Sequence, residues 1–329
     1  MKTNVRGMIE HNDIAITKII SAACRDFMAF RGFHNFEFKD GINSIVGGNA
    51  SGKSSLIALI RQALSPQISS HRGSRWGGDY SGISLVELKF MARGKTHYLR
   101  RVIQDSDHTT DLHLYIGEGE DGEFLRDGEV VTYLTKLKPL LIFDDFQSSR
   151  REFYYHLDRS SVAANPPFSK SIEMIDEVNR LLPVTNCPVK KIVKSGNDVM
   201  AEYEDRLVHL NTLAGGQIKT VYVLSKILTL LSGMKERDLS RVILIDEMEL
   251  GLDRSTIKGL NEAIKQISTE HDCQFMMTSR FVNGRVNPIT VSRFRMHNYY
   301  KTQTTPGNNK SIQSLIRKYI NQVNIKWKP

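Results

Sequence analysis

Apolar and polar positions along the chain follow two periods, one typical of buried strands and one typical of helices. Buried strands are predicted at Ile42–Val46, with a helix over residues 56–64 after it, and at Val242–Ile245, with a helix over residues 255–267 after it. Because strand–helix alternation brings successive strands together in parallel, we predict an α/β fold with a parallel core sheet. The other predicted elements are strands at residues 23–30, 33–38, 140–143, 189–193, 198–203 and 275–278, and helices at residues 171–182 and 217–231.

Residues 83 to about 131 show a different pattern. Short segments alternate apolar and polar side chains, and turns such as residues 92–94 and 118–122 separate them. This period-two alternation with frequent turns predicts an antiparallel β meander. We therefore expect an antiparallel β lobe beside the core sheet.

Composition narrows the class of protein without indicating a function. Of the 329 residues, 40% are hydrophobic and 25% are charged, as in ordinary folded proteins. No apolar run approaches the roughly 18 residues that span a bilayer, and the first residues do not resemble a signal peptide. Cys24, Cys187 and Cys273 show no disulfide or metal-ligand spacing. We expect a cytoplasmic protein with no membrane partner, and the secreted, membrane-spanning, fibrous and disordered classes are excluded.

The net charge of +9 is concentrated at the C-terminal end. Residues 280–329 contain ten lysines and arginines and no acidic residue, whereas residues 1–279 contain 35 basic and 36 acidic side chains. An acid-free segment favours an anionic partner, most often nucleic acid; a merely solvated surface is the alternative. The aromatic residues of this segment suit either stacking on single-stranded nucleic acid or packing against the protein. Residues 311–323 have the apolar spacing of a docked amphipathic helix.

The strongest chemical signal is the sequence GGNASGKSS, which matches the phosphate-loop pattern GxxxxGK followed by Ser or Thr. Glycines let backbone N–H groups approach a phosphate closely, and the N-terminus of the following helix favours an anion. Lys53 would bind the β- and γ-phosphates of a nucleotide, and the Ser54 hydroxyl would bind Mg²⁺. A glycine-rich turn without a ligand is the alternative. The expected phosphate-binding residues are Gly47, Gly48, Asn49, Ala50, Ser51, Gly52, Lys53, Ser54 and Ser55.

A second signal is a run of four apolar residues that ends in Asp246 and Glu247. Two carboxylates at the end of a buried strand are costly unless they do electrostatic work. In phosphate-loop enzymes such a carboxylate orients Mg²⁺, and a neighbouring one can polarise the attacking water. We therefore expect Asp246 to help hold the metal and Glu247 to be catalytic. Solvated acids at a strand end are the alternative.

The order of these motifs resembles the ABC ATPase superfamily, in the branch of structural-maintenance-of-chromosomes (SMC) proteins and RecF-like repair ATPases. Residues 30–57 are similar to that branch's first strand, hairpin and phosphate loop, and LAGGQ at residues 213–217 resembles the signature LSGGQ. The Asp-Glu pair stands where the Walker B carboxylates belong, and residues 251–253 match the D-loop. The resemblance covers about residues 23–282 and implies an ATPase head that uses ATP and Mg²⁺.

The resemblance also implies roles for residues outside the phosphate loop. The signature binds the γ-phosphate held by the opposite subunit, which implies a homodimer or higher homo-oligomer with ATP between head-to-tail heads. Gln147 is the candidate for the glutamine that links metal and γ-phosphate, and Arg280 for the switch residue. Arg31 matches an arginine beside the nucleotide; a surface hairpin arginine is the alternative. The other implied nucleotide-binding residues are Ala214, Gly215, Gly216, Gln217 and Asp253.

Three features depart from the family pattern. Ala214 replaces the signature serine and lacks its hydroxyl, although Gly215 and Gly216 still offer backbone N–H groups at a helix start; a turn that only caps the helix is the alternative. Arg280 replaces the usual switch histidine as a permanent cation, unless it only begins the basic segment. Slow or partner-dependent hydrolysis is therefore expected. No heptad run or CxxC hook lies between the phosphate loop and the signature.

We expect three parts along the chain: an N-terminal extension at residues 1–11, a compact ATPase head at residues 12–286 and a basic segment at residues 287–329. The head would contain the β meander at about residues 83–131 and a small helical insertion at about residues 147–182.

The sequence favours an ATPase that couples ATP-driven dimerisation to DNA-associated work, in repair, recombination or anti-phage defence, with a separate effector or nuclease chain. A nucleotide-gated scaffold or sensor with little turnover is the alternative. A transporter ATP-binding subunit fits the N-terminal hairpin and the strand-rich insertion less well.

Overall fold

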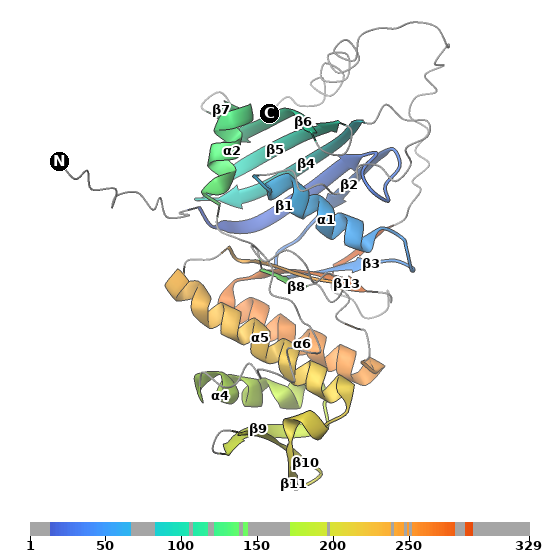
Figure 1. The fold of residues 1–329 in the computed structure, drawn as a ribbon, viewed down its shortest axis with the longest axis vertical. Coiled ribbons are helices and arrows are strands. Elements are labelled where there is room, and N and C mark those ends of the chain that lie inside the picture. The colour runs from blue at the N-terminus through green and yellow to red at the C-terminus, as the bar shows by residue number, and fades with distance from the viewer. Residues whose placement is uncertain are drawn as a thin grey trace, which may run out of the picture.

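The computed structural model describes residues 14–66, 83–104, 108–117, 122–137, 141–143, 172–195, 198–237, 240–246, 249, 252–279 and 287–291. These residues form three β sheets and the helices that cover them. Along the longest axis of Figure 1, a six-stranded sheet is followed by the core sheet, a helical layer and a small sheet. Within the described ranges, none of the helices combines the length and the apolar character needed to cross a membrane.

The core sheet consists of parallel strands, which confirms the predicted parallel core. Its strands are β3 (Ile42–Val46), β8 (Leu141–Phe143), β12 (Val242–Ile245), β13 (Gln274–Ser279) and β14 (Pro288–Thr290). Their order is β14–β3–β13–β12–β8, and every neighbouring pair is parallel. β14 starts after residue 286, where we expected the head to end, so the core sheet extends to residue 290.

Helices cover both faces of the core sheet. Successive side chains of a strand point to opposite faces, so neighbouring residues of β12 show which helices lie on each face. Leu244 of β12 packs in the apolar cluster that contains α1 (Lys53–Leu64). Its neighbour Ile245 packs in the cluster that contains α5 (Gly215–Arg237) and α6 (Arg254–His271). α1 and α5 therefore lie on opposite faces of the core sheet (Figure 1).

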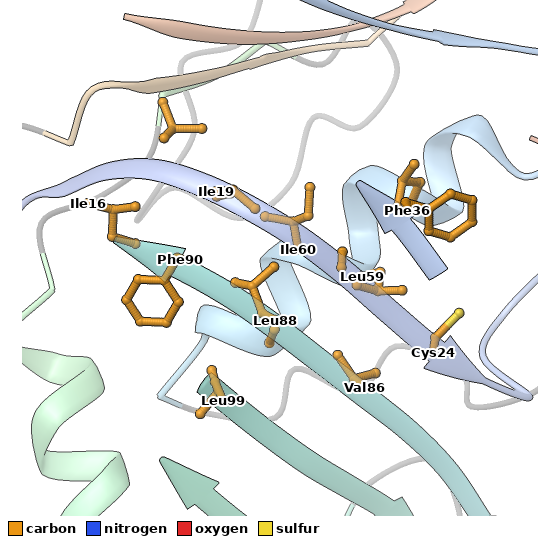
Figure 2. Packing of buried hydrophobic residues seen from close by; sticks show 14 of the residues in the cluster. Ile16, Ile19, Cys24, Phe36, Leu59, Ile60, Val86, Leu88, Phe90 and Leu99 are labelled. Carbon is orange, nitrogen blue, oxygen red and sulfur yellow. The ribbon is translucent and has the colours of Figure 1, made fainter. Parts of the chain in front are cut away.

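The six-stranded sheet is antiparallel throughout and confirms the predicted meander. Its strands are β1 (Ile16–Arg25), β2 (Phe33–Glu37), β4 (Ile83–Ala92), β5 (Lys95–Gln104), β6 (His108–Ile116) and β7 (Glu123–Arg126). Their order is β2–β1–β4–β5–β6–β7. Figure 2 shows Leu59 and Ile60 of α1 beside Ile19 of β1 and Leu88 of β4. α1 is thus held between this sheet and the core sheet.

The strand predicted at residues 23–30 has the wrong boundaries. β1 spans Ile16–Arg25 instead. Asp26 and Met28 have φ of 50° and 48°, in the left-handed region, so the chain turns there. Phe27 and Phe30, which follow Arg25, are buried in this turn and not in the sheet.

The meander ends earlier than predicted, because Asp127–Thr135 forms the helix α2 and not a strand to residue 131. Glu129 Oε2 accepts a hydrogen bond from the backbone N–H of Arg126 and helps to cap the helix. Val130 and Leu134, one helical turn apart, are both buried.

The small sheet confirms the predicted hairpin and adds a strand to it. β9 (Val189–Ser195), β10 (Asp198–Tyr203) and β11 (Arg206–His209) are antiparallel, and β11 was not predicted. α4 (Ile172–Leu181) confirms the helix predicted at residues 171–182. The rest of the expected insertion and the helix expected at residues 311–323 lie outside the described residues. Short 3-10 helices occur at Leu182–Thr185 and Leu210–Thr212.

A buried glutamine joins the core sheet to the six-stranded sheet. Gln274 Oε1 accepts a hydrogen bond from Ile19 N at 2.8 Å, and its Nε2 donates to the carbonyl oxygens of Ile19 and Lys39, each at 2.9 Å. Nearby, Ser240 Oγ accepts from Ile16 N at 3.0 Å. Because buried backbone groups need partners, these bonds fix how β1 lies against the core sheet.

Replacing Gln274 by leucine keeps the volume of this side chain but removes its hydrogen bonds. We expect the free energy of unfolding to fall by about 2–4 kcal/mol, because buried backbone groups of Ile19 lose their partners. Urea unfolding followed by circular dichroism measures the change. Thr269→Ala, which removes an exposed hydroxyl bond on α6, is the control and should change stability by less than about 0.5 kcal/mol. A Gln274→Leu protein as stable as this control would contradict the claim that the hydrogen bonds of Gln274 join the two sheets.

Candidate functional site

The loop between β3 and α1 has a backbone shape that requires glycine at two positions. Gly52 has φ of 109° and caps the N-terminus of α1, and a Cβ there would lie 2.9 Å from the buried ring of Phe30. A Cβ on Gly47 would lie 2.3 Å from Ser51 Oγ and 2.8 Å from the Val291 carbonyl oxygen. Gly47 and Gly52 are therefore fixed by sterics, whereas a Cβ on Gly48 would meet nothing within 4 Å. Gly48, Asn49 and Ala50 form the exposed tip of the loop, and Ser55 is buried in α1.

Lys53 is the first residue of α1, and its side chain reaches back to this loop. Its Nζ donates to the carbonyl oxygens of Gly47 and Gly48, each at 2.9 Å. The chain thus curls around the amine at the start of α1, where backbone N–H groups and the helix dipole favour an anion. Ser54 is exposed in the first turn, and Ser51 Oγ is buried without a hydrogen-bond partner within the described ranges. An orphaned hydroxyl in such a loop fits a phosphate ligand.

Strand order places Asp246 at the same edge of the core sheet as the phosphate loop. β13 lies between β3 and β12, and Gly47 N donates to the Ser279 carbonyl oxygen at 3.3 Å. Parallel strands end at the same edge, so Asp246, directly after β12, lies at the edge where the loop leaves β3. Thr278 Oγ1 donates to Asp246 Oδ1 at 2.6 Å and orients that carboxylate.

These donors suit Mg²⁺ held together with a nucleotide. Ser54 and Asp246 offer hydroxyl and carboxylate oxygens, which Mg²⁺ prefers, and the ion commonly takes its remaining ligands from water and substrate phosphates. Across the described part of the chain, no group of three or more His, Cys, Asp or Glu side chains is arranged to hold a metal ion.

The signature residues begin α5, on the face of the core sheet opposite α1. Ala214 and Gly215 are exposed, and Ala214 N donates to Gln217 Oε1 at 3.0 Å. Gln217 thus satisfies one backbone N–H of the helix start, where Gly215 is exposed and Gly216 is half-buried. The structure does not bring the signature onto the same layer as the phosphate loop.

Asp253 caps the N-terminus of α6. Its Oδ1 accepts from Ser255 N at 2.9 Å and Thr256 N at 3.0 Å, and its Oδ2 accepts from Thr256 Oγ1 at 2.6 Å. The Thr256 hydroxyl, followed by the Thr256 backbone N–H, holds the pKa of this carboxyl below its ordinary value. The described contacts of Asp253 are those of a helix cap, and nucleotide binding by this residue stays a prediction.

The remaining predicted site residues are placed only in part. Arg31 is exposed on the turn between β1 and β2, directly after Phe30, whose ring lies under Gly52. Glu247, Gln147 and Arg280 lie outside the described residues, and their roles stay predictions.

Sequence reasoning missed a second carboxylate of this region. Ser279 Oγ donates to Glu249 Oε1 at 2.6 Å, and both residues are buried. The sequence did contain one signal for this bond. Two hydroxyl residues, Thr278 and Ser279, end one buried strand, and acidic residues follow another. The pairing itself joins residues that are 30 positions apart, so local periodicity cannot reveal it.

Comparison with known proteins agrees with this architecture. Residues 23–272 match the family model described as "AAA domain", whereas no curated protein matches the sequence. The SMC head domain from Thermotoga maritima shares 16% identity at a TM-score of 0.52, over 80% of this chain and 89% of that one. An SmcHead bound to the C-winged helix domain of ScpA shares 15% identity at a TM-score of 0.55, over 83% of this chain and 94% of that one.

A third solved structure is an Smc head domain with an extended coiled coil, bound to the C-terminal domain of ScpA derived from Pyrococcus furiosus. It shares 14% identity at a TM-score of 0.50, over 85% of this chain and 94% of that one. At these identities the similarity establishes the fold, and it confirms the expected α/β head. The chain belongs to the AAA domain family, and its fold is that of an SMC-type ATPase head.

Proposed function

We propose that this protein binds and hydrolyses ATP with Mg²⁺ as its cofactor. The observation that carries the proposal is the loop around Lys53, whose amine is held by two loop carbonyls at the start of α1. The Asp246 carboxylate, oriented by Thr278, lies at the same edge of the core sheet. A cation, helix-terminal N–H groups and a carboxylate suited to Mg²⁺ together match the needs of a nucleoside triphosphate.

In the proposed reaction, Lys53 and the loop N–H groups hold the β- and γ-phosphates while water attacks the γ-phosphorus in line with the leaving oxygen. Glu247 accepts the proton of that water, and ADP leaves with the bridging oxygen. Ser54 and Asp246 would hold Mg²⁺, which supplies neutralisation of charge on the phosphate oxygens when it is bound.

The signature supports a homodimer with two ATP molecules between its heads. Gly215 and Gly216 begin α5 on the face of the sheet opposite α1, and Gly215 is exposed. A second copy, placed head to tail, would therefore supply these N–H groups to the γ-phosphate held at Lys53. Arg280 would add a permanent cation and Gln147 a link between metal and γ-phosphate; both roles rest on the sequence.

The partners are proposed from charge and from the solved relatives. The acid-free residues 280–329 favour nucleic acid, so we infer work on DNA in repair, recombination or anti-phage defence. Two of the similar SMC heads were solved bound to a domain of ScpA, which supports a separate effector protein for this head as well.

If the basic segment binds duplex DNA, its affinity should fall steeply with salt, with a log–log slope of about −0.9 per neutralised phosphate. Fluorescence anisotropy over a NaCl series measures that slope. Arg317→Gln combined with Lys318→Gln should reduce its magnitude by about 1.8 if both residues contact phosphates. Lys191→Gln combined with Lys194→Gln removes two exposed charges from β9 and should leave it unchanged. A flat salt response of the wild-type protein would exclude DNA binding through phosphates.

A nucleotide-gated scaffold or sensor is the second candidate. The observation that favours it is Ala214, which stands exposed at the start of α5 and offers no hydroxyl to a γ-phosphate. In that function ATP binding alone drives dimerisation, and turnover is incidental. Such a protein keeps its biological output when hydrolysis is removed, whereas a turnover-dependent enzyme loses it.

A further inference from the structure

Ser279 connects the phosphate loop to the segment that follows β12. Its backbone carbonyl oxygen accepts from Gly47 N at 3.3 Å, and its hydroxyl donates to Glu249 Oε1 at 2.6 Å. The Glu249 carbonyl oxygen in turn accepts from Leu252 N at 3.1 Å, one residue before the Asp253 cap of α6. A continuous set of hydrogen bonds therefore runs from the phosphate loop to the D-loop.

Two adjacent hydroxyl residues of β13 each donate a hydrogen bond to a carboxylate that follows β12. Thr278 binds Asp246 and Ser279 binds Glu249, each at 2.6 Å. Asp246 and Glu249 both follow β12, and each is held by its own residue of β13. The Thr278 anchor serves a residue already expected to hold the metal, whereas the Ser279–Glu249 anchor has no assigned role.

Burial makes the second anchor strong. Glu249 is 8% exposed and Ser279 is 4% exposed. A hydrogen bond to a carboxylate is roughly twice as strong as one between neutral groups, and low exposure protects it from competition by water. Removing either partner leaves a buried polar group with less compensation, so the segment would shift to find a new partner.

We propose that Ser279 and Glu249 form a positioning pair, which holds Leu252 and the Asp253 cap of α6 in register with the phosphate loop. This inference rests on the proposed ATPase function. Neither side chain acts on the nucleotide directly, because the pair works through the backbone of its neighbours. Loss of the pair therefore lowers the rate of hydrolysis and leaves the affinity for ATP unchanged.

The first test is Ser279→Ala, with Ser268→Ala as its matched control. The Ser268 hydroxyl is also buried and donates at 2.6 Å, to the Cys273 carbonyl oxygen at the far end of α6. We expect kcat of Ser279→Ala to fall about tenfold, as for loss of one hydrogen bond to a charged group. Its affinity for a fluorescent ATP analogue should stay within about threefold of wild type, because Lys53 is untouched. Ser268→Ala should keep the wild-type kcat.

The second test separates positioning from chemistry at Glu249. Glu249→Gln keeps an acceptor oxygen for Ser279 and should keep kcat within about threefold of wild type, whereas Glu249→Ala should lose about tenfold. The double variant with Ser279→Ala should be no worse than Glu249→Ala alone, because both changes remove the same bond. If Glu249→Ala does not fold, the kcat values of Glu249→Gln and Ser279→Ala still test the pair.

The outcomes distinguish this inference from the proposed function. A wild-type protein that neither binds nor hydrolyses ATP contradicts both. An active wild type whose Ser279→Ala variant matches Ser268→Ala in kcat overturns the positioning pair alone. So does a Glu249→Gln variant as inactive as Glu249→Ala, since it would show that the charge itself takes part in the chemistry.

Discussion

Lys53→Ala is expected to weaken ATP binding about 100-fold. The amine is the main side-chain cation of the loop, and its bonds to the carbonyl oxygens of Gly47 and Gly48 also hold the loop closed. Losing a charged contact to the β- and γ-phosphates should raise Kd about 100-fold, or ~3 kcal/mol. Titration with a fluorescent ATP analogue measures this change.

Lys258→Ala is the control for charge removal, because Lys258 is exposed on α6. It should bind ATP with wild-type affinity. The midpoint of thermal unfolding without nucleotide shows whether Lys53→Ala remains folded. A folded Lys53→Ala protein with unchanged ATP affinity would contradict the phosphate-loop assignment.

Glu247→Gln is expected to remove hydrolysis while keeping ATP binding. A general base contributes about 10²–10⁴-fold to such a reaction, so kcat should fall by at least about 100-fold. The ATP-bound dimer should live longer, because turnover no longer separates the heads. Single-turnover hydrolysis measures the chemical step, and light scattering measures the dimer.

Glu262→Gln, at an exposed position of α6, is the matched control and should hydrolyse ATP as the wild type does. A Glu247→Gln protein with wild-type kcat would remove Glu247 from the mechanism. The same variant also separates the two candidate functions, since a scaffold would keep its biological output and a turnover-dependent enzyme would not.

Local patterns predicted the parts of the fold that depend on neighbouring residues. The glycines of the phosphate loop and the apolar run of β12 are continuous in sequence, and both appear where the pattern placed them. α2 was mistaken for a strand, because Val130 and Val131 favour strands and the segment is short. The hydrogen bond between Glu129 and the backbone N–H of Arg126 stabilises the helix start, and it forms only once the first turn of the helix is in place.

Long-range pairings could not be predicted from one sequence. β14 has only three residues, and its place is set by pairing with β3 from more than 240 positions away. Gln274 looks like an ordinary polar strand residue until Ile19 is brought beside it. The Ser279–Glu249 bond belongs to the same class, because it depends on the register of β12 and β13.

The steady-state ATPase rate per subunit, measured against protein concentration with and without DNA, tests the central claim most directly. If two heads complete each other's sites, the rate per subunit should rise with concentration until the dimer saturates, and DNA should raise it further. A rate per subunit that is independent of concentration, or no hydrolysis above the Lys53→Ala background under every condition, would contradict an ATPase that works as a dimer around ATP.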